Sequence, residues 1–380
     1  MRILIDYRAA LRERSGVGEY THELARALLK ARAAMRSGED PLELTLFSSS
    51  WKDRLTPPPD LSDAAVVDRR LPVGLLNLAW HRLGWPPVER LAGAPFDVAH
   101  SLHPLLMPAR RAARVVTIHD LHFLDHPERT RAEIRRDYPA LVRGHAARAD
   151  RVIVVSRFTA GEVARRLGIA PDQISICSPG APEWAPRTTP VANGYILYFG
   201  TLEPRKNVGG LLDAYERLAS NRRSMPRLLL AGKATEEAAP WLDRIARPPL
   251  LGRVTHAGYV DPVNRRALYE GAIMLVQPSF EEGFGIPVLE AMATGVPVVV
   301  SNRGALPEVA GDAGVIVEPD DPVAMARAIE RFVDDPAAAA AAAARGLDRA
   351  RTFTWADTAA RTIAAYRAAI ARRAARRGAA

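Results

Sequence analysis

Two runs of alternating strand and helix patterns, separated by a proline-rich segment, constrain the fold of this chain more than any other feature. The separating segment, residues 178–194, carries Pro179, Pro182, Pro186 and Pro190 among small side chains, which is typical of a linker. Short β-branched runs alternate with helical spacing on both sides of it, as they do in buried parallel sheets. This pattern predicts an α/β protein with two doubly wound domains, in which ligands bind at the carboxyl ends of the strands.

The expected elements follow from these runs. Before the linker, the predicted strands span Ile3–Asp6, Leu44–Phe47, Asp97–Ser101, Val115–His119 and Val152–Ser156, and the predicted helices span Gly18–Lys30, Arg131–Ala147 and Thr159–Leu167. After it, the predicted strands span Tyr195–Gly200, Leu228–Gly232, Val254–Gly258, Ile273–Pro278 and Val296–Ser301. The alanine run 337–344 and a segment from Trp355 to about Arg377 predict two closing helices. We expect an N-terminal domain over 1–185 and a C-terminal domain over 190–350.

Charge and cysteine content narrow the classes of function. The net charge of +9 is concentrated after residue 344, where nine arginines face two aspartates, so the rest of the chain is close to neutral. A nucleic-acid-binding face would need basic residues spread through the fold, so we expect no nucleic-acid partner. The single cysteine, Cys177, excludes an internal disulfide and fits a reducing compartment.

The relation to membranes follows from the apolar segments and the basic end. No uninterrupted apolar run approaches the ~20 residues that a membrane span needs, and the run in Met1–Asp6 is too short for a secretory signal. The segment Leu75–Arg82, with Trp85 after it, predicts either a buried helix or one that faces an acceptor lipid or the membrane. The arginine-rich end predicts either a solvated helix face or a segment that attracts anionic headgroups. We expect a cytoplasmic protein, placed on the inner face of the membrane if that end binds lipid.

The segment Phe280–Glu290 predicts a binding site for an anion flanked by hydroxyl groups. Glu282 and Glu290 stand eight residues apart, and Pro287 suits the first turn of a helix. The turn between the two acids consists of Gly283, Phe284, Gly285 and Ile286. Its backbone N–H groups and the positive end of the helix dipole favour an anion. Because both carboxylates can accept hydroxyl hydrogen bonds, we infer a nucleotide-sugar pocket; alternatively, Glu290 only complements the helix dipole.

The segment Gly200–Asn207 predicts a phosphate clamp. It follows the strand pattern of Tyr195–Phe199 and precedes an apolar helix, so Arg205 and Lys206 place two positive charges where ligands bind. Arginine can bind phosphate through two hydrogen bonds, and lysine adds a compact charge. The alternative is a solvated pair, but positive charge is mildly unfavourable at the start of a helix.

A metal site is the less favoured interpretation of the histidine-rich loop. His119, His122 and His126 lie near Asp120 and Asp125, which are all possible ligands. They share one loop, and the sequence offers no second cluster of ligands. The chain also contains no Asp-x-Asp pair, which favours protein cations over a divalent metal as partners of a phosphate. We therefore expect no metal and no other cofactor.

The acids Glu282 and Glu290, together with the segment Glu203–Asn207, resemble the signature of the retaining glycosyltransferases of family four. The resemblance extends over nearly the whole chain and is strongest to members that use GDP-mannose. It implies the GT-B fold, with two Rossmann-like doubly wound domains facing each other across a cleft and the last helix, 352–380, packed back on the N-terminal domain. It also implies transfer of a sugar, here mannose, to a hydroxyl of a lipid-linked or polysaccharide glycan precursor.

The resemblance assigns roles to the same residues. Glu282 would hold the hydroxyl groups of the sugar, and Glu290 the diol of the ribose. Arg205 and Lys206 would bind the diphosphate, whose departing phosphate accepts the proton of the acceptor. Thr201 stands where many members carry a further arginine. This departure leaves Arg205 and Lys206 as the main clamp.

Three further loops match the family. The matching positions are Gly16 and Gly18 in the first loop, His119 in the second, and Val260 and Asp261 in the third. The first loop would face the acceptor and the donor's phosphate, the second the transferred sugar, and the third the base. A carboxylate at position 261 can accept both N–H groups of the Watson–Crick edge of guanine, which favours GDP. The alternative for Asp261 is a helix N-cap.

Other functions remain open at this point. A transferase of the same fold could use a UDP-sugar as its donor. A nucleotide-sugar epimerase shares the two-domain architecture and also needs a diphosphate clamp, but it needs no acceptor. A subunit that binds a nucleotide sugar without catalysis is the alternative from a different class of protein.

Overall fold

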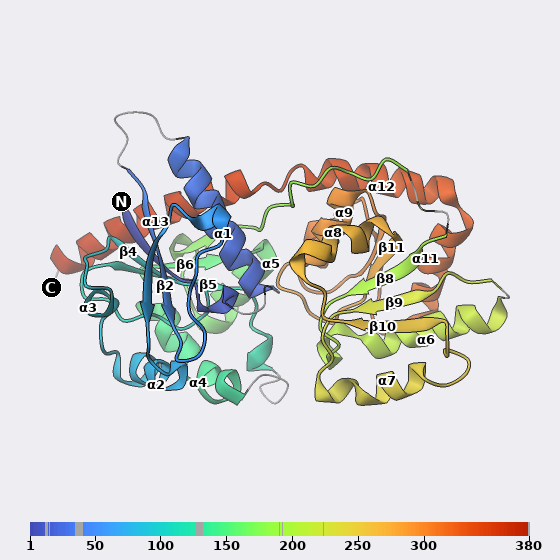
Figure 1. Ribbon diagram of the computed structural model, residues 1–380, viewed down its shortest axis with the longest axis horizontal. Helices are drawn as coiled ribbons and strands as arrows, with labels where there is room; N and C mark the ends of the chain where they lie inside the picture. The colour runs from blue at the N-terminus through green and yellow to red at the C-terminus, as the bar shows by residue number, and fades with distance from the viewer. Residues whose placement is uncertain are drawn as a thin grey trace. The chain divides into compact units, whose positions relative to one another are not determined.

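The computed structural model describes residues 1–11, 14, 16–34, 41–125, 132–189, 191, 193–222 and 224–378. They form two compact units. Unit 1 comprises Met1–Gly180 and Thr354–Ala380, and unit 2 comprises Ala181–Phe353. Each unit is a sheet of parallel strands with helices on both faces (Figure 1).

Unit 1 contains a sheet with the strand order β3-β2-β1-β4-β5-β6-β7. Its strands are β1 (Arg2–Asp6), β2 (Glu43–Ser49), β3 (Ala65–Arg69), β4 (Val98–Ser101), β5 (Ala113–Ile118), β6 (Arg151–Val154) and β7 (Ile174–Ile176). Its helices are α1 (Val17–Ala33), α2 (Val73–Leu78), α3 (Val88–Ala92), α4 (Ala132–Arg148), α5 (Arg157–Leu167) and α13 (Trp355–Gly378). All neighbouring strands pair in parallel, so every strand ends at the same edge of the sheet.

Helices cover both faces of the unit 1 sheet. On one face, α1 and α13 pack against each other, and α13 also contacts β5 and β6. On the other face, Val116 and Val152 pack against Val142 of α4 and Val163 of α5. Alternate residues of a strand point to opposite faces, which explains why these strands are apolar at almost every position.

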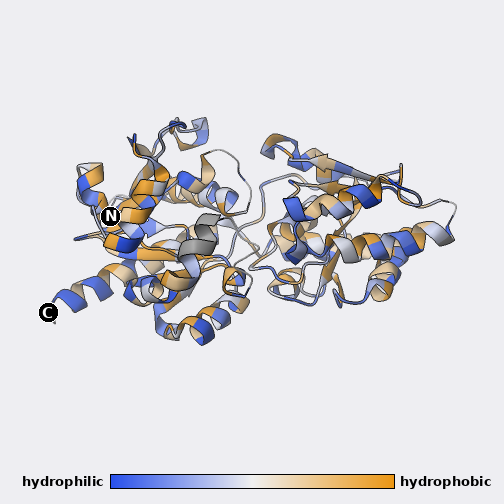
Figure 2. Ribbon diagram, turned by 90° about the horizontal axis from the view of Figure 1, so that it is seen from below, coloured by the Kyte–Doolittle hydropathy of each residue, from blue (hydrophilic) through white to orange (hydrophobic). Residues whose placement is uncertain are grey.

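The arginines near the end of α13 contact acids of unit 1. Asp150 is fully buried and accepts a hydrogen bond from Arg376 Nη1 at 3.2 Å. Arg373 Nη1 lies 3.9 Å from the same carboxylate, and Arg372 Nη1 lies 3.7 Å from Asp172. The end of α13, beside the C mark in Figure 2, is mostly hydrophilic. Much of its positive charge is therefore engaged with protein groups.

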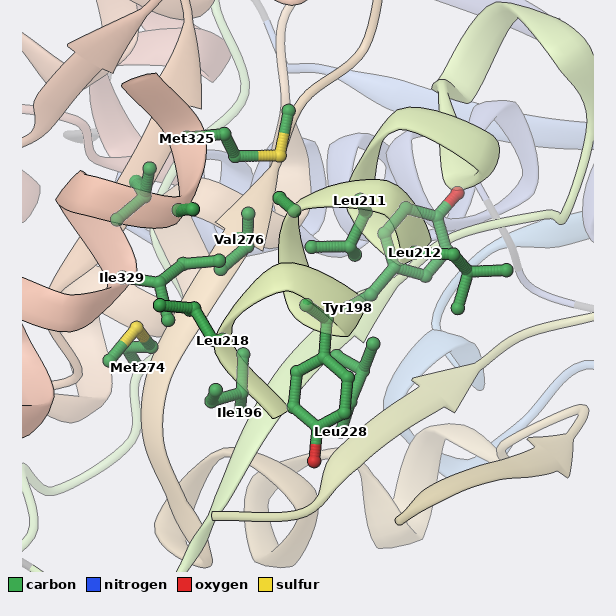
Figure 3. Close-up of a cluster of buried hydrophobic side chains, with 14 of the residues drawn as sticks. Ile196, Tyr198, Leu211, Leu212, Leu218, Leu228, Met274, Val276, Met325 and Ile329 are labelled. Atoms are coloured by element: carbon green, nitrogen blue, oxygen red, sulfur yellow. The ribbon is translucent and has the colours of Figure 1, made fainter. Parts of the chain in front are cut away.

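Unit 2 contains a second parallel sheet, with the strand order β10-β9-β8-β11-β12-β13. Its strands are β8 (Tyr195–Phe199), β9 (Leu228–Ala231), β10 (Val254–Gly258), β11 (Ala272–Gln277), β12 (Val298–Ser301) and β13 (Val315–Val317). Its helices are α6 (Val208–Asn221), α7 (Ala239–Ile245), α8 (Pro262–Glu270), α9 (Ile286–Thr294), α10 (Leu306–Ala310), α11 (Pro322–Asp334) and α12 (Pro336–Ala350). Figure 3 shows its core, where Ile196 and Met274 of the sheet pack with Leu211 of α6 and Ile329 of α11.

The predicted strands are confirmed, with small differences at their ends. The structure adds three strands that the sequence patterns did not predict, namely β3, β7 and β13. Each of these three is the outermost strand on one side of its sheet, and most of their side chains are only partly buried. No helix among the described residues is long and apolar enough to cross a membrane.

Candidate functional site

The candidate site of unit 2 lies where the strand order of its sheet reverses. The chain runs outward from β8 to β9 and β10, and then returns to the other side of β8 with β11. Neighbouring loops diverge at such a point and leave a crevice at the carboxyl ends of the strands. The loops that follow β8, β10 and β11, together with the start of α9, carry the predicted site residues of this unit.

Arg205 lies in a short 3-10 turn, Pro204–Lys206, directly after β8. Its Nη2 and Nε donate hydrogen bonds to Glu203 Oε1 at 2.8 and 3.2 Å, and its Nη1 donates one to the Glu281 carbonyl oxygen at 2.9 Å. These contacts fix the plane of the guanidinium group, because Glu203 holds the edge formed by Nε and Nη2 while the Glu281 carbonyl group holds Nη1. Glu203 is a positioning residue that the sequence patterns did not single out.

Lys206 and Glu282 form an ion pair across the loops after β8 and β11. Glu282 Oε1 also accepts hydrogen bonds from Ser279 Oγ at 3.0 Å and Gln277 Nε2 at 3.2 Å, and Glu282 Oε2 lies 3.6 Å from Arg205 Nη1. Burial alone would raise the pKa of Glu282, but the charges of Lys206 and Arg205 outweigh it and lower the pKa. The structure thus brings two adjacent cations together with one ionised carboxylate, which follows Lys206 by 76 residues in the sequence.

The turn before α9 presents backbone N–H groups next to these charges. Gly285 adopts φ 108°, which favours glycine, and no side chain of the described residues caps the start of α9 at Ile286. A Cβ at Gly285 would lie 2.7 Å from Leu306 Cδ2, so the turn is also tightly packed. Phe284 is buried against Phe353, with ring centroids 5.7 Å apart. An uncapped, rigid helix start of this kind favours an anion.

Glu290 lies in a separate buried network. Its Oε1 accepts a hydrogen bond from Arg265 Nη1 at 3.2 Å, and its Oε2 accepts one from Tyr269 Oη at 2.7 Å. Burial, together with the charge of Glu290, raises the pKa of Tyr269 well above its usual value, so the phenol stays protonated and donates. A carboxylate offers about four lone-pair positions, so Glu290 can accept hydrogen bonds from several donors at once. The sequence patterns did not predict Arg265 and Tyr269 as partners of Glu290, because both residues lie on a different helix, α8, at distances of 25 and 21 residues in the sequence.

Gly304 is a further residue of the site that the sequence patterns did not single out. It lies in the loop after β12 with φ 62°, and a Cβ there would lie 2.5 Å from the backbone oxygen of Glu282. The next residue, Ala305, donates its N–H to that oxygen at 2.9 Å. The loop after β12 therefore supports the backbone that carries Glu282.

We expect Gly304→Ala to reduce catalytic turnover about a hundredfold, because the added methyl group must displace the backbone of Glu282. Gly252→Ala is the matched control: its φ of 75° gives similar strain, but a Cβ there meets nothing within 4 Å. Steady-state kinetics and melting temperatures of both variants check this. Equal losses in the two variants would show that backbone strain, and not displacement of Glu282, explains the effect.

The third loop of unit 2 holds Val260 and Asp261. Asp261 is exposed and caps α8, because its Oδ1 accepts a hydrogen bond from the N–H of Val263 at 3.0 Å. The structure thus shows the N-cap that was the alternative for this residue. The cap uses Oδ1, and a role in recognising a base stays a prediction.

The other predicted site residues belong to unit 1. Gly16 precedes α1 with φ 50°, and Gly18 is buried in the first turn of that helix. His119 follows β5, and its ring packs edge-on against Tyr20 with centroids 5.1 Å apart. Its Nε2 is buried and has no hydrogen-bond partner among the described residues. This nitrogen is available to a ligand hydroxyl group.

The described residues contain no group of three or more His, Cys, Asp or Glu side chains that could hold a metal ion. His126, one of the five residues of the candidate metal loop, lies outside the described residues. Burial lowers the pKa of His119 to about 4, so this side chain is neutral at neutral pH.

We expect unit 1 to lose stability as the pH falls from about 6.5 towards 4. Burial lowers the pKa of His100 to about 3 and the pKa values of His119 and His145 to about 4. Because the unfolded chain binds more protons than the native chain in this range, unfolding takes up about three protons at pH 5. Hydrogen exchange at pH 7 and pH 5 measures this. Unit 2, which contains only His256, is the internal control, and equal protection of unit 1 at both pH values would contradict the prediction.

Comparisons with known proteins match both units. A family model described as Glycosyltransferase Family 4 matches residues 14–182, and one described as Glycosyl transferases group 1 matches residues 193–335. O-antigen chain mannosyltransferase B of Escherichia coli is 32% identical over 93% of this chain and 96% of its own length. Sucrose-phosphate synthase from Thermosynechococcus elongatus has a TM-score of 0.77 at 21% identity and covers 97% of this chain and 98% of its own. Anabaena Alr3699/HepE in complex with UDP-glucose has a TM-score of 0.68 at 18% identity and covers 94% and 97%.

Proposed function

The chain belongs to the group 1 glycosyltransferases of family four, and on this premise we propose that it transfers mannose from GDP-mannose to an acceptor hydroxyl group with retention. It has the GT-B fold. The observation that carries the proposal is the convergence of Arg205, Lys206 and Glu282 beside the uncapped start of α9. Two cations and a helix N-terminus favour a diphosphate, and the carboxylate favours the hydroxyl groups of a sugar.

The proposed reaction needs a stabilised leaving group. The bond between the anomeric carbon and the diphosphate oxygen breaks, and its electron pair leaves with the diphosphate. Lys206, Arg205 and the N–H groups at residues 283–286 stabilise the charge that develops there, which is usually the largest catalytic contribution. The acceptor oxygen bonds to the anomeric carbon from the same face, and its proton passes to the departing phosphate oxygen, which yields GDP. No divalent metal takes part in this proposal.

The ion pair between Lys206 and Glu282 is compatible with binding of the donor's diphosphate and sugar at this site. The two side chains neutralise each other in their ion pair, and Arg205 is held by Glu203. A bound diphosphate gives Lys206 a second anionic partner, and the sugar hydroxyl groups donate to the carboxylate of Glu282. We assign Glu282 to orientation of the sugar and not to nucleophilic attack. His119 would accept a hydrogen bond from the sugar through its neutral ring.

Two observations of different kinds support GDP-mannose as the donor. The Glu203–Asn207 segment resembles that of enzymes that use GDP-mannose, and the full-length relative from Escherichia coli is a mannosyltransferase. The structural likeness to a protein in complex with UDP-glucose favours a second candidate, transfer from a UDP-sugar. Melting temperatures with GDP, UDP and ADP separate the two, since a ligand that binds the native state raises the melting temperature. We expect the largest rise with GDP, and a larger rise with UDP would favour the second candidate.

The reaction itself is tested with GDP-mannose and a panel of short glycans on octyl chains as acceptors. We expect a product one mannose heavier, with an α-linkage by NMR and an unchanged rate in EDTA. A rate that is lost in EDTA and restored by manganese would refute metal independence. A changed sugar nucleotide formed without acceptor would identify an epimerase, and tight GDP-mannose binding without turnover would identify a non-catalytic subunit. The acceptor we propose is a glycan precursor carried on a lipid at the inner face of the membrane.

A further inference from the structure

Residues 73–85 of unit 1 expose large apolar side chains that the core does not use. The buried side of this segment already packs into the core, where Leu76 and Trp80 contact Phe47 and Val88. The opposite side exposes four large apolar residues, Leu75 (66%), Leu78 (48%), Leu83 (75%) and Trp85 (56%). We call these four residues the apolar strip. Single exposed apolar side chains are common, but four within eleven residues form a surface feature.

The backbone of the segment keeps the strip on the outside. Helix α2 ends at Leu78 and continues as a π-helical turn, Ala79–Leu83, which ends at Gly84 in the left-handed region. Leu75, Leu78 and Arg82 follow one another at helical spacing on the exposed side. In Figure 1, α2 lies near the lower end of unit 1.

Positive charge surrounds the strip. Residues 69–92 contain four exposed arginines, Arg69, Arg70, Arg82 and Arg90, and a single acid, Glu89. The carboxylate of Glu89 accepts hydrogen bonds from the backbone N–H groups of residues 110–112, so it is engaged with the protein. The Arg90 guanidinium group lies 5.6 Å from the ring of Trp85. Leucine, tryptophan and arginine side by side match the layered chemistry of a bilayer surface, where apolar side chains enter below the phosphates and arginines stay among them.

The arginine-rich helix α13 is less suited than the apolar strip to bind a bilayer surface. Arg373 and Arg376 contact Asp150, and Arg372 contacts Asp172. These pairs would have to be given up, or shared, when an anionic lipid binds. No large apolar side chain of the described part of α13 is exposed beside them. A charged surface without apolar side chains cannot insert into a membrane.

We propose that the apolar strip, with its surrounding arginines, is the surface through which this protein binds a bilayer that contains anionic phospholipid. The inference deepens the proposed function and rests on it, because a lipid-carried acceptor is delivered at that surface. The binding itself can be measured without any transfer reaction, so failure of one does not imply failure of the other.

The test uses the full-length protein and co-sedimentation with vesicles of phosphatidylglycerol and phosphatidylcholine in equal parts, or of phosphatidylcholine alone. The variant Leu75→Ser/Leu83→Ser/Trp85→Ser removes three apolar side chains from the strip. Leu251→Ser/Ile316→Ser, at exposed positions of unit 2, is the matched control. Arg372→Ala/Arg376→Ala tests α13. Transfer from GDP-mannose to a water-soluble acceptor is measured on each variant.

We expect the wild-type protein and the unit 2 control to bind the anionic vesicles, and the strip variant to bind about thirtyfold more weakly. Binding should fall at high salt and on phosphatidylcholine alone, because the arginines supply part of the attraction. The α13 variant should bind as the wild type does, and all variants should keep the wild-type rate on the soluble acceptor. Strip-variant binding equal to that of the wild type, or loss of binding in the α13 variant only, would overturn the proposal. The proposal would also be overturned if the wild-type protein forms a dimer, does not bind vesicles, and becomes a monomer when the strip is substituted. In that case the partner of the strip is a second copy of this chain.

Discussion

Lys206→Ala should lower kcat for mannose transfer by about two to three orders of magnitude. In the proposed transition state, the Nζ of Lys206 stabilises charge that grows on the diphosphate, and removal of one such donor has an effect of this size in enzymes that stabilise an anion. The loss should appear in kcat as well as in kcat/KM, because the interaction is stronger in the transition state than with the bound donor. Steady-state kinetics with GDP-mannose and a saturating acceptor measure both constants.

The controls separate this effect from unfolding. Lys206→Ala leaves the carboxylate of Glu282 without its closest cation, but Arg205, Ser279 and Gln277 still contact it. We therefore expect a lower melting temperature but a folded protein. Lys206→Ala/Glu282→Gln removes the uncompensated charge and should recover stability without recovering activity. Lys30→Ala, on the exposed end of α1, should be silent. A kcat within threefold of the wild-type value in Lys206→Ala would remove this residue from the catalytic site.

Glu290→Gln should lower kcat/KM for the donor by about ten- to a hundredfold. A hydrogen bond to a charged acceptor contributes about 1.5–3 kcal/mol, and the amide replaces one accepting oxygen by a donor that opposes Tyr269 or the ribose hydroxyl groups. Alanine is the poorer choice here, because it would remove the charged partner of buried Arg265, which typically costs about 3–5 kcal/mol of stability. Glutamine keeps the volume of the side chain. Kinetics at varied GDP-mannose and melting curves check the two effects separately.

A matched ion pair provides the control for Glu290. Glu330→Gln changes an acceptor of Arg222 in a partly exposed ion pair between α11 and the residue that follows α6, so it should alter neither activity nor stability by more than a few tenths of a kcal/mol. If Glu290→Gln lowers the melting temperature but leaves kcat/KM within twofold of the wild-type value, the carboxylate serves the packing of α8 against α9 and not the ribose.

The sequence predicted those parts of the fold that local patterns determine. The doubly wound sheets were predicted from interior strands such as β5 and β11, whose apolar runs are long enough to recognise. The family and its GT-B fold, both confirmed, were predicted from Glu282, Glu290 and the segment Glu203–Asn207. The edge strands β3 and β13 were missed because short, half-buried strands carry little hydrophobic pattern. The alanine-rich helix α12 was predicted, but not its contact with α9, where a Cβ at Gly346 would lie 3.2 Å from Met292 Cγ. Small side chains allow this close approach, and no local pattern reveals it.

The same distinction applies to the candidate site. Arg205, Lys206 and Glu282 could be predicted because they follow strands whose carboxyl ends share one edge of the sheet. Their partners could not be predicted, since these depend on contacts between distant segments. Arg265 of α8 approaches Glu290 across 25 residues of sequence. The buried Asp150 similarly engages Arg376, 226 residues away, which changes how the arginine-rich end is interpreted.

In the proposed mechanism, Arg205, Lys206 and the start of α9 bind a diphosphate. Calorimetric titration of the wild-type protein with GDP and with guanosine, which lacks the phosphates, tests it without any acceptor. Two charge-assisted contacts of about 1.5–3 kcal/mol each predict that GDP binds at least about a hundredfold more tightly than guanosine. In Arg205→Ala/Lys206→Ala most of that difference should disappear. Equal affinities of the wild-type protein for GDP and guanosine, or a difference that the double variant retains in full, would contradict the claim.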